Sequence, residues 1–252
     1  MASGMNLLLK RSVPLAVRNP FRRAHGLLFL HKRTHSFSQR EQFFNHAFRA
    51  LSFNGIDGDY TEFGCGWKTF SLAYHCSQKY KHAAKLWGFD SFEGLPPQEM
   101  EADEHQKWNA GTMAKSLEDF KIQCSANGVP QNAYTLTKGY YKETIEQMAP
   151  FVEPKNIALA YIDCDLYSST TSVLQFLKPR LKHGMVIACD DYHCWSATQL
   201  AGERKAMQEF FDASDEWSLL PYLPIGWHGQ SFVVESKQLF KKAMADPISI
   251  TV

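Results

Sequence analysis

The chain has 252 residues, of which 44% are hydrophobic and 21% charged, and this composition excludes collagen-like, disulfide-scaffold and wholly disordered proteins. The length suffices for one full-sized α/β domain or at most two small ones, and no 18-residue apolar run is present that would span a membrane as a helix. The net charge of +1 hides an asymmetry: residues 1–40 hold eight Lys or Arg and no acid, and the other 212 residues carry 19 basic and 26 acidic side chains.

We therefore predict a basic N-terminal arm at residues 1–39, ahead of a domain at residues 40–252. Three roles stay open for the arm: a mitochondrial-type transit peptide, contact with an anionic surface, or packing on the body or a neighbouring subunit. We expect no nucleic-acid partner, because the acidic body would oppose a phosphate backbone. The six cysteines form no Cys-x-x-Cys pair, which favours a reduced, cytoplasmic location and argues against zinc knuckles.

Beyond the arm, the chain alternates helix-like and strand-like segments. Apolar residues recur at helical spacing in the first segment, and later segments switch between this period and short apolar runs bounded by turn residues. In chain order we predict helices at residues 39–51, 68–79, 116–126, 142–148, 169–181 and 201–211, and strands at residues 60–63, 85–89, 134–136, 157–162, 185–189, 217–220 and 231–234.

This alternation predicts an α/β fold. Several of the strands are apolar throughout, as expected where both faces of a parallel sheet are covered. We therefore expect a mostly parallel, seven-stranded, Rossmann-like sheet with helices on both faces. Residues 91–112 form a long polar stretch with Pro and Gly, which is typical of a functional loop or lid.

Four of the predicted strands end in polar or glycine-rich clusters, at residues 62–66, 90–91, 163–165 and 190–191. In open α/β sheets, ligands bind beyond the carboxyl ends of the strands. If these strands are parallel, all four clusters share one edge of the sheet. The sequence therefore predicts a ligand site at that edge.

The first cluster offers a tight turn with accessible backbone ahead of a helix. It is not the dinucleotide fingerprint, because Thr69 stands where a third glycine is needed, and this disfavours a nicotinamide-dependent reductase. Asp90 ends the second strand, where a carboxylate suits ribose hydroxyls. S-adenosylmethionine, a nucleoside ligand without a pyrophosphate, fits this pattern. The candidate cofactor-binding residues are Glu62, Gly64, Gly66, Asp90 and Ser91.

Aspartates at the ends of two further strands indicate a metal site. Asp163, Asp190 and Asp191 would repel one another at a shared edge unless a cation or a proton intervenes. Oxygen ligands in this number suit Mg²⁺. The alternative is that they are helix caps and turn residues, which aspartate commonly supplies.

Together these segments resemble the macrocin O-methyltransferase (TylF/MycF) family over about residues 40–235. The resemblance implies a class I methyltransferase fold, S-adenosylmethionine as donor, and Mg²⁺-dependent methylation of a sugar hydroxyl on a glycoside, glycan or natural product. It assigns Asp163, Asp190 and Asp191 to the metal, and the carboxyl ends of the first two strands to the donor. The family's second glycine is replaced by Lys68, so we expect a differently shaped donor turn. The matching strings are YTEFG (60–64), GFDSFEGLP (88–96), KGY (138–140), IDCDLYSST (162–170) and DDY (190–192).

Methyl transfer is an in-line displacement that requires an aligned, partly deprotonated acceptor oxygen. His193 and His105 are candidate general bases, and Asp165 is a candidate to orient the metal shell. We expect a sugar-containing substrate and a homo-oligomer. Two alternatives stay open: a catechol-type phenol methyltransferase, and a catalytically inactive nucleoside-binding protein of the same fold. Aromatic candidates for a sugar pocket are Trp108, Tyr140, Tyr141, Trp195 and Trp227.

Overall fold

The computed structural model describes residues 39–146, 153–194 and 196–245. The chain divides into two units between Gln39 and Arg40, and the elements described below belong to the second unit, Arg40–Val252. The predicted basic arm lies outside the described residues, apart from Gln39. Among the described residues, no helix combines the length and the apolar character needed to cross a membrane.

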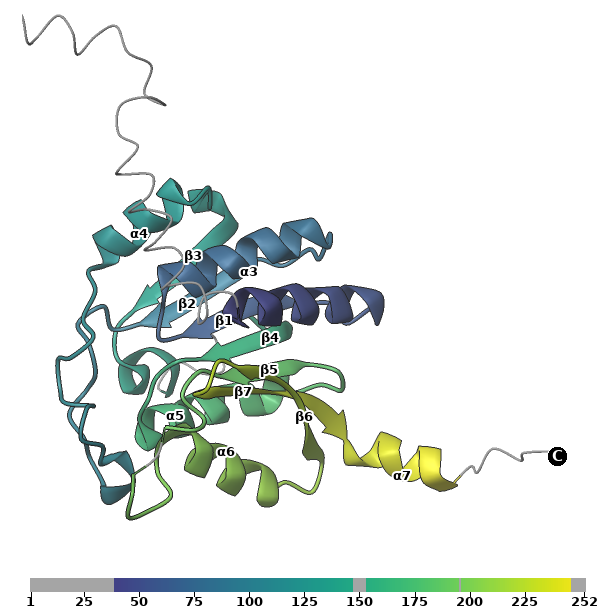
Figure 1. The fold of residues 1–252 in the computed structure, drawn as a ribbon. Helices are drawn as coiled ribbons and strands as arrows, with labels where there is room; N and C mark the ends of the chain where they lie inside the picture. The colour runs from purple at the N-terminus through teal and green to yellow at the C-terminus, as the bar shows by residue number, and fades with distance from the viewer. Residues whose placement is uncertain (1–38, 147–152, 195, 246–252) are drawn as a thin grey trace, which may run out of the picture. The chain divides into compact units, whose positions relative to one another are not determined.

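Helices and strands alternate along the chain, as the sequence predicts (Figure 1). The helices are residues 39–53, α3 (Trp67–Lys79), α4 (Leu117–Ala126), α5 (Tyr167–Leu177), α6 (Gly202–Asp212) and α7 (Lys237–Ala245). The strands are β1 (Asp59–Phe63), β2 (Leu86–Asp90), β3 (Tyr134–Lys138), β4 (Ile157–Ile162), β5 (Val186–Cys189), β6 (Trp217–Ile225) and β7 (Gly229–Ser236).

The strands form one sheet in the order β3-β2-β1-β4-β5-β7-β6. The first five are parallel, and β7 is antiparallel to both β5 and β6. The carboxyl ends of β1–β5 therefore meet at one edge, and the turn between β6 and β7 lies at the same edge because β6 runs in the direction of β5. The chain order reverses between β1 and β4, which is where ligands bind in doubly wound sheets.

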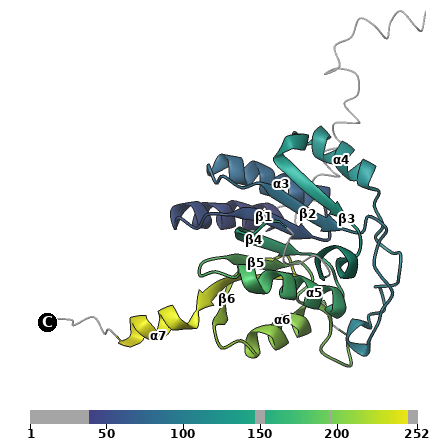
Figure 2. The ribbon, with the colours of Figure 1, turned by 180° about the vertical axis from the view of Figure 1, so that it is seen from behind.

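Each face of the sheet is covered by helices that bury an apolar core (Figure 2). The helix of residues 39–53, α3 and α4 cover one face, where Phe44 stacks on Tyr161 with ring centroids 5.4 Å apart. α5 and α6 cover the other face, where Phe63 stacks on Phe89 at 5.2 Å. These cores fix the strand ends on which the site is built.

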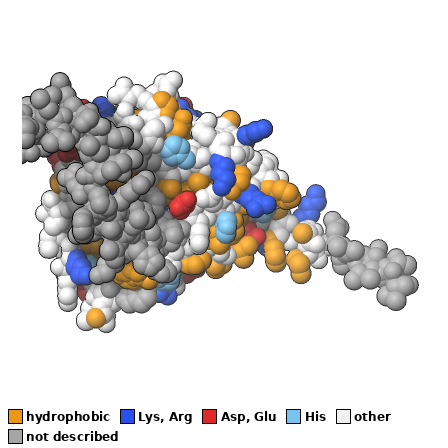
Figure 3. Space-filling model, turned by 45° about the horizontal axis from the view of Figure 1, so that its top comes forward, with side chains coloured by type: hydrophobic (Ala, Val, Ile, Leu, Met, Phe, Trp, Pro, Cys, Tyr) orange, Lys and Arg blue, Asp and Glu red, His pale blue; other side chains and the backbone are white. Residues whose placement is uncertain are grey.

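Besides the longer strands β6 and β7, three helical segments differ from the prediction. The predicted helix 169–181 is α5 followed by the 3-10 turn η5 (Lys178–Arg180), because Pro179 ends the α-helix. The predicted helix 142–148 is a single π-helical turn, η4 (Lys142–Glu146), as far as the structure describes it. The helix α7 was not predicted, and its side chains Leu239, Phe240 and Met244 are exposed. Figure 3 shows hydrophobic side chains in orange at the right of this face of the molecule.

The loop of residues 91–116, which we call the lid, packs on the start of α5. It contains the 3-10 turn η2 (Glu101–Asp103), and the fully buried Asp103 carboxylate accepts a hydrogen bond of 2.8 Å from the Ser168 N–H. Trp108 of the lid is 3% exposed and packs with Leu95 and Leu166. The lid is therefore anchored by a helix cap and a small apolar cluster.

Candidate active site

A pocket lies at the carboxyl ends of β1–β4 beneath the lid. Its volume is about 1000 Å³ when the solvent-filled space at its open mouth is included. Gly64, Asp90 and Ser91, three of the five predicted cofactor-binding residues, line it. Asp163 and Asp165 line its other side. Three of the predicted donor residues and one of the predicted metal residues, Asp163, thus face one cavity, whereas Asp190 and Asp191 are not among its lining residues.

Gly64 is required by the close approach of the loops that follow β1 and β4. Its φ is +83°, in the left-handed region, and a Cβ there would lie 1.7 Å from the Asp163 carbonyl oxygen. No other residue fits this position, so the glycine places the pocket wall directly beside Asp163.

Glu62 and Gly66 lie behind the pocket wall and do not line it. The buried Glu62 carboxylate accepts hydrogen bonds from the Gly66 N–H (2.7 Å) and the Thr69 hydroxyl (2.6 Å), and also from the Tyr60 hydroxyl. Burial raises the Glu62 pKa to about 7, although these hydrogen bonds act to lower it. Glu62 therefore fixes the shape of the donor turn. Lys68, which replaces the family's second glycine, lies exposed in the first turn of α3.

Asp90 connects the donor turn to the start of the lid. Its two carboxylate oxygens accept hydrogen bonds from the Cys65 N–H (2.6 Å) and the Phe92 N–H (2.5 Å). Burial raises the Asp90 pKa, and these hydrogen bonds oppose the rise. The hydroxyl of Ser91 donates to the Gly94 carbonyl at 2.9 Å. Both residues hold their side chains in place at the pocket rim.

Five carboxyl groups gather where β4 and β5 end: Asp163, Asp165, Asp190, Asp191 and Glu203. Burial, together with the charges of the neighbouring acids, raises the pKa of Asp163, Glu203 and Asp165, the last to about 8. The sequence analysis missed Glu203, which is fully buried in α6. It accepts hydrogen bonds from the Cys164 N–H (3.2 Å) and the Asp191 N–H (3.0 Å), and so joins the two strand ends.

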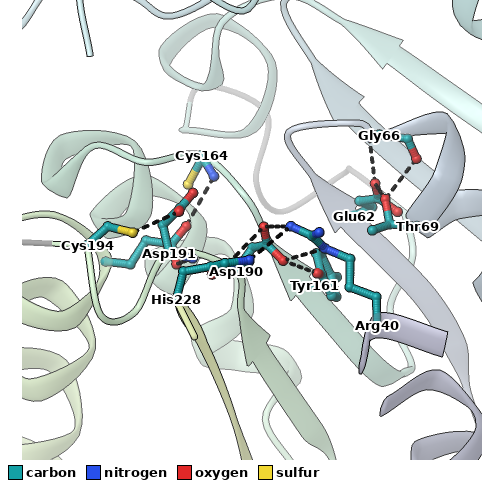
Figure 4. Close-up of polar contacts among 11 residues, drawn as sticks. Arg40, Glu62, Gly66, Thr69, Tyr161, Cys164, Asp190, Asp191, Cys194 and His228 are labelled. Carbon is teal, nitrogen blue, oxygen red and sulfur yellow. Dashed lines mark hydrogen bonds and ion pairs between the residues drawn. The ribbon is translucent and has the colours of Figure 1, made fainter. Parts of the chain in front are cut away.

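Within this cluster, Asp190, Asp191 and His228 each offer a ligand atom within 4.8 Å of the others. His228, in the β6–β7 turn, was not predicted, and Asp163 is outside this trio. Figure 4 shows Arg40, Tyr161 and His228 converging on Asp190. The Arg40 guanidinium binds both Asp190 oxygens, at 3.1 and 2.5 Å, and the Tyr161 hydroxyl donates to one of them.

The chemistry of this donor set fits a divalent cation. Burial and the mutual repulsion of the acids raise the pKa of Asp163, Asp165 and Glu203, and a bound cation would relieve this repulsion. Carboxylate oxygens suit Mg²⁺ or Mn²⁺, and the His228 imidazole adds a ligand that Mn²⁺ accepts more readily.

The three predicted catalytic residues differ in their placement. Asp165 lines the pocket with φ +62°, and the Leu166 N–H behind it donates to the Cys164 carbonyl at 2.6 Å. Such a backbone conformation is costly for a residue with a side chain and is found preferentially at functional sites. His105 stacks on Trp108 at 3.9 Å, and the His193 N–H donates to the His228 carbonyl at 2.7 Å. Neither histidine lines the pocket.

The predicted aromatic residues are also divided. Tyr140 and Tyr141 line the pocket, whereas Trp108 is buried in the lid cluster. Trp227 is 78% exposed beside His228, with ring centroids 5.2 Å apart. Trp195 lies outside the described residues.

Comparisons with known proteins identify the family and the fold. Residues 32–215 match the family model of macrocin-O-methyltransferase (TylF). A Streptomyces olivaceus protein, 8-demethyl-8-(2,3-dimethoxy-alpha-L-rhamnosyl)-tetracenomycin-C 4'-O-methyltransferase, is 30% identical over 151 residues. That match spans 55% of this chain and 54% of the relative, so the chain covers about half of the relative's length.

Two solved methyltransferases share the fold. The O-methyltransferase NovP is 20% identical, with a TM-score of 0.62, over 79% of this chain and 80% of that one. The calicheamicin methyltransferase CalS11 is 23% identical, with a TM-score of 0.61, over 90% of this chain and 88% of that one. The predicted class I methyltransferase fold is thereby confirmed.

Proposed function

The chain belongs to the macrocin O-methyltransferase family, and from this premise we propose that it transfers a methyl group from S-adenosylmethionine to a sugar hydroxyl. The proposal rests on one observation, that the residues of the donor turn and the acids line the same cavity. One cavity joins the donor turn after β1 to the acids after β4. A donor held in this cavity would lie beside Asp163 and Asp165, which are near the groups that could hold a cation.

The donor would occupy the pocket between the β1 turn and the lid. Gly64 gives the ligand access to backbone, and Asp90 at the end of β2 is positioned for ribose hydroxyls. The lid covers this pocket and excludes water, because Leu95 and Pro96 contribute to its wall. These residues supply alignment, which can lower the barrier by about 7–11 kcal/mol in favourable cases.

We assign the cation to Asp190 and Asp191, with His228 beside them and Asp163 between them and the donor. A bound Mg²⁺ or Mn²⁺ supplies Lewis-acid activation of the acceptor hydroxyl. The carboxylates fix the position of this charge at the pocket edge, and Glu203 holds their backbone in place.

Asp165 is our candidate to accept the proton of the acceptor hydroxyl. Of the three candidates from the sequence, only Asp165 lines the pocket. Because its pKa is raised to about 8 by burial and by the neighbouring Asp191, it can accept this proton only in its ionised form, which is favoured at alkaline pH. His105 and His193 do not line the pocket, so we do not assign this role to them.

The relative from Streptomyces olivaceus acts, by its name, on a rhamnosyl group. We therefore propose a sugar hydroxyl of a glycoside, glycan or natural product as the acceptor. Two adjacent hydroxyls would match the paired carboxylates Asp190 and Asp191, because a cation held there can bind both. A catechol presents a similar pair and is the comparison acceptor in the test.

The test is transfer of isotope-labelled methyl from S-adenosylmethionine to matched panels of rhamnosides and catechols. We expect methylated rhamnosides and no methylated catechols, and the Asp163→Ala variant should lose turnover while it still binds S-adenosylhomocysteine. Turnover of catechols alone would replace the sugar assignment. Unchanged turnover in Asp163→Ala would contradict the role of the acids.

A further inference from the structure

The Arg40 side chain reaches from the first turn of the helix of residues 39–53 into the cation site. Its Nε lies 3.1 Å from one Asp190 oxygen and its Nη2 lies 2.5 Å from the other. The same Nη2 lies 3.5 Å from the Nε2 of His228. The guanidinium is thus a cation already held by two of the three candidate metal ligands.

The hydrogen bonding of His228 points to a ligand role for its Nε2. Its Nδ1 lies 2.5 Å from the Asp190 carbonyl oxygen, which can only accept, so Nδ1 carries the proton. Nε2 then has a free electron pair directed toward Arg40. Histidines that bind metals commonly donate their other ring N–H to a backbone carbonyl in this way.

A divalent cation bound by both Asp190 and His228 would occupy the place that the Arg40 Nη2 now takes between the Asp190 Oδ2 and the His228 Nε2. Metal–ligand bonds to carboxylate oxygen and imidazole nitrogen are about 2.0–2.2 Å long. The Arg40 nitrogens already occupy the Asp190 oxygens, and the Tyr161 hydroxyl takes a further position on one of them. Entry of the cation therefore requires the guanidinium to move.

We propose that Arg40 is an internal competitor of the divalent cation: its guanidinium occupies Asp190 and His228 until the cation displaces it. This inference rests on the proposed function. Arg40 keeps the buried Asp190 carboxylate neutralised in the cation-free protein, where an unpaired buried charge is costly. The displaced guanidinium leaves His228 as a cation ligand.

The experiment measures Mn²⁺ binding by the loss of the free-ion paramagnetic resonance signal, in protein saturated with S-adenosylhomocysteine and without acceptor. Arg40→Gln should bind Mn²⁺ about tenfold more tightly than the unchanged protein, since a charge-assisted hydrogen bond no longer has to be broken. Arg49→Gln, an exposed arginine on the same helix, is the matched control and should bind Mn²⁺ as the unchanged protein does.

Two further variants keep the test decisive. Arg40→Lys retains the charge but loses the paired hydrogen bonds, so its affinity should fall between the other two, and it serves if Arg40→Gln does not fold. Pulsed resonance of bound Mn²⁺ should show coupling to an imidazole nitrogen that disappears in His228→Gln.

Equal or weaker Mn²⁺ binding by both Arg40 variants would overturn the proposal, because the two cations would then occupy separate places. Failure of every variant, and of the unchanged protein, to bind Mn²⁺ would overturn both this proposal and the cation assignment. The donor part of the proposed function would stand or fall separately, on the binding of S-adenosylhomocysteine.

Discussion

Gly64 is the glycine at which the surrounding backbone leaves least room for a side chain. A Cβ 1.7 Å from the Asp163 carbonyl oxygen forces the β1 and β4 loops apart. We predict that Gly64→Ala loses S-adenosylhomocysteine binding and a large part of its free energy of unfolding, measured by calorimetric titration and by denaturant unfolding.

Gly55→Ala is the matched control for that substitution. Gly55 also has a left-handed φ, +66°, but no atom lies within 4 Å of its added Cβ. The free energy of unfolding of this variant should fall by only about 1–2 kcal/mol, the cost of a left-handed backbone for alanine, and the variant should bind S-adenosylhomocysteine normally. Equal losses in the two variants would show that φ alone, and not the contact with Asp163, demands glycine at position 64.

Glu62 makes stability depend on pH in a definite direction. Its pKa is raised from 4.5 to about 7, so the folded protein holds this proton more tightly than the unfolded chain. The stabilising contribution is complete below about pH 4.5 and is lost as pH rises through 7. The corresponding loss in the free energy of unfolding is roughly 3 kcal/mol.

Glu62→Gln tests this dependence, because glutamine keeps an oxygen for the Gly66 N–H and does not titrate. The free energy of unfolding of the variant, minus that of the unchanged protein, should rise between pH 4.5 and pH 7.5 in urea titrations. Parallel profiles for the two proteins would show that Glu62 has an ordinary pKa.

At this scale the sequence predicted the residues that end strands, since a parallel sheet brings strand ends together whatever the loops do. Asp90, Asp163 and Asp165 were found on the pocket for that reason. Arg40 and His228 were missed because neither follows a parallel strand. A reading of the last two strands as a hairpin would have brought His228 to the same edge.

The lid is held in place by Asp103, a lid residue that caps the first turn of α5. Asp103 is fully buried, accepts the Ser168 N–H of α5, and also accepts the Glu99 N–H at 3.1 Å. We predict that Asp103→Ala releases the lid. Hydrogen exchange should accelerate at the Leu95 and Gly111 amides, and S-adenosylhomocysteine should bind more weakly.

Ser116→Ala is the control for loss of a cap alone. The Ser116 hydroxyl caps α4 by accepting the Asp119 N–H at 3.0 Å, and it does not hold the lid. This variant should lose about 1 kcal/mol of unfolding free energy and leave lid exchange unchanged. If Asp103→Ala behaves in the same way, the lid is held by the Trp108 cluster instead.

Two elements show where the sequence analysis fell short. The strand 217–220 was predicted to stop before Pro221, but β6 continues to Ile225 because it is an edge strand, where missing N–H groups need no partner. The helix α7 was not predicted, although its apolar residues Leu239, Phe240 and Met244 fall on one helical face; the structure buries none of its residues.

For the whole molecule, the predicted layers and strand number are confirmed, because alternating apolar segments allow few other arrangements. The antiparallel placement of β7 was not fixed by the pattern of its residues. That placement brings the β6–β7 turn to the functional edge, so the same topological detail explains why His228 completes the acid cluster.

The central claim is that the pocket at this edge binds the methyl donor next to a cation site. The most direct test is a thermal-unfolding titration of the full chain with S-adenosylhomocysteine, with and without Mn²⁺. At about 100 times the dissociation constant, the ligand should add roughly 2.7 kcal/mol of stability. We expect a saturable upward shift of the unfolding temperature that grows further with Mn²⁺, whereas no shift in a folded, monodisperse sample would rule out donor binding at this pocket.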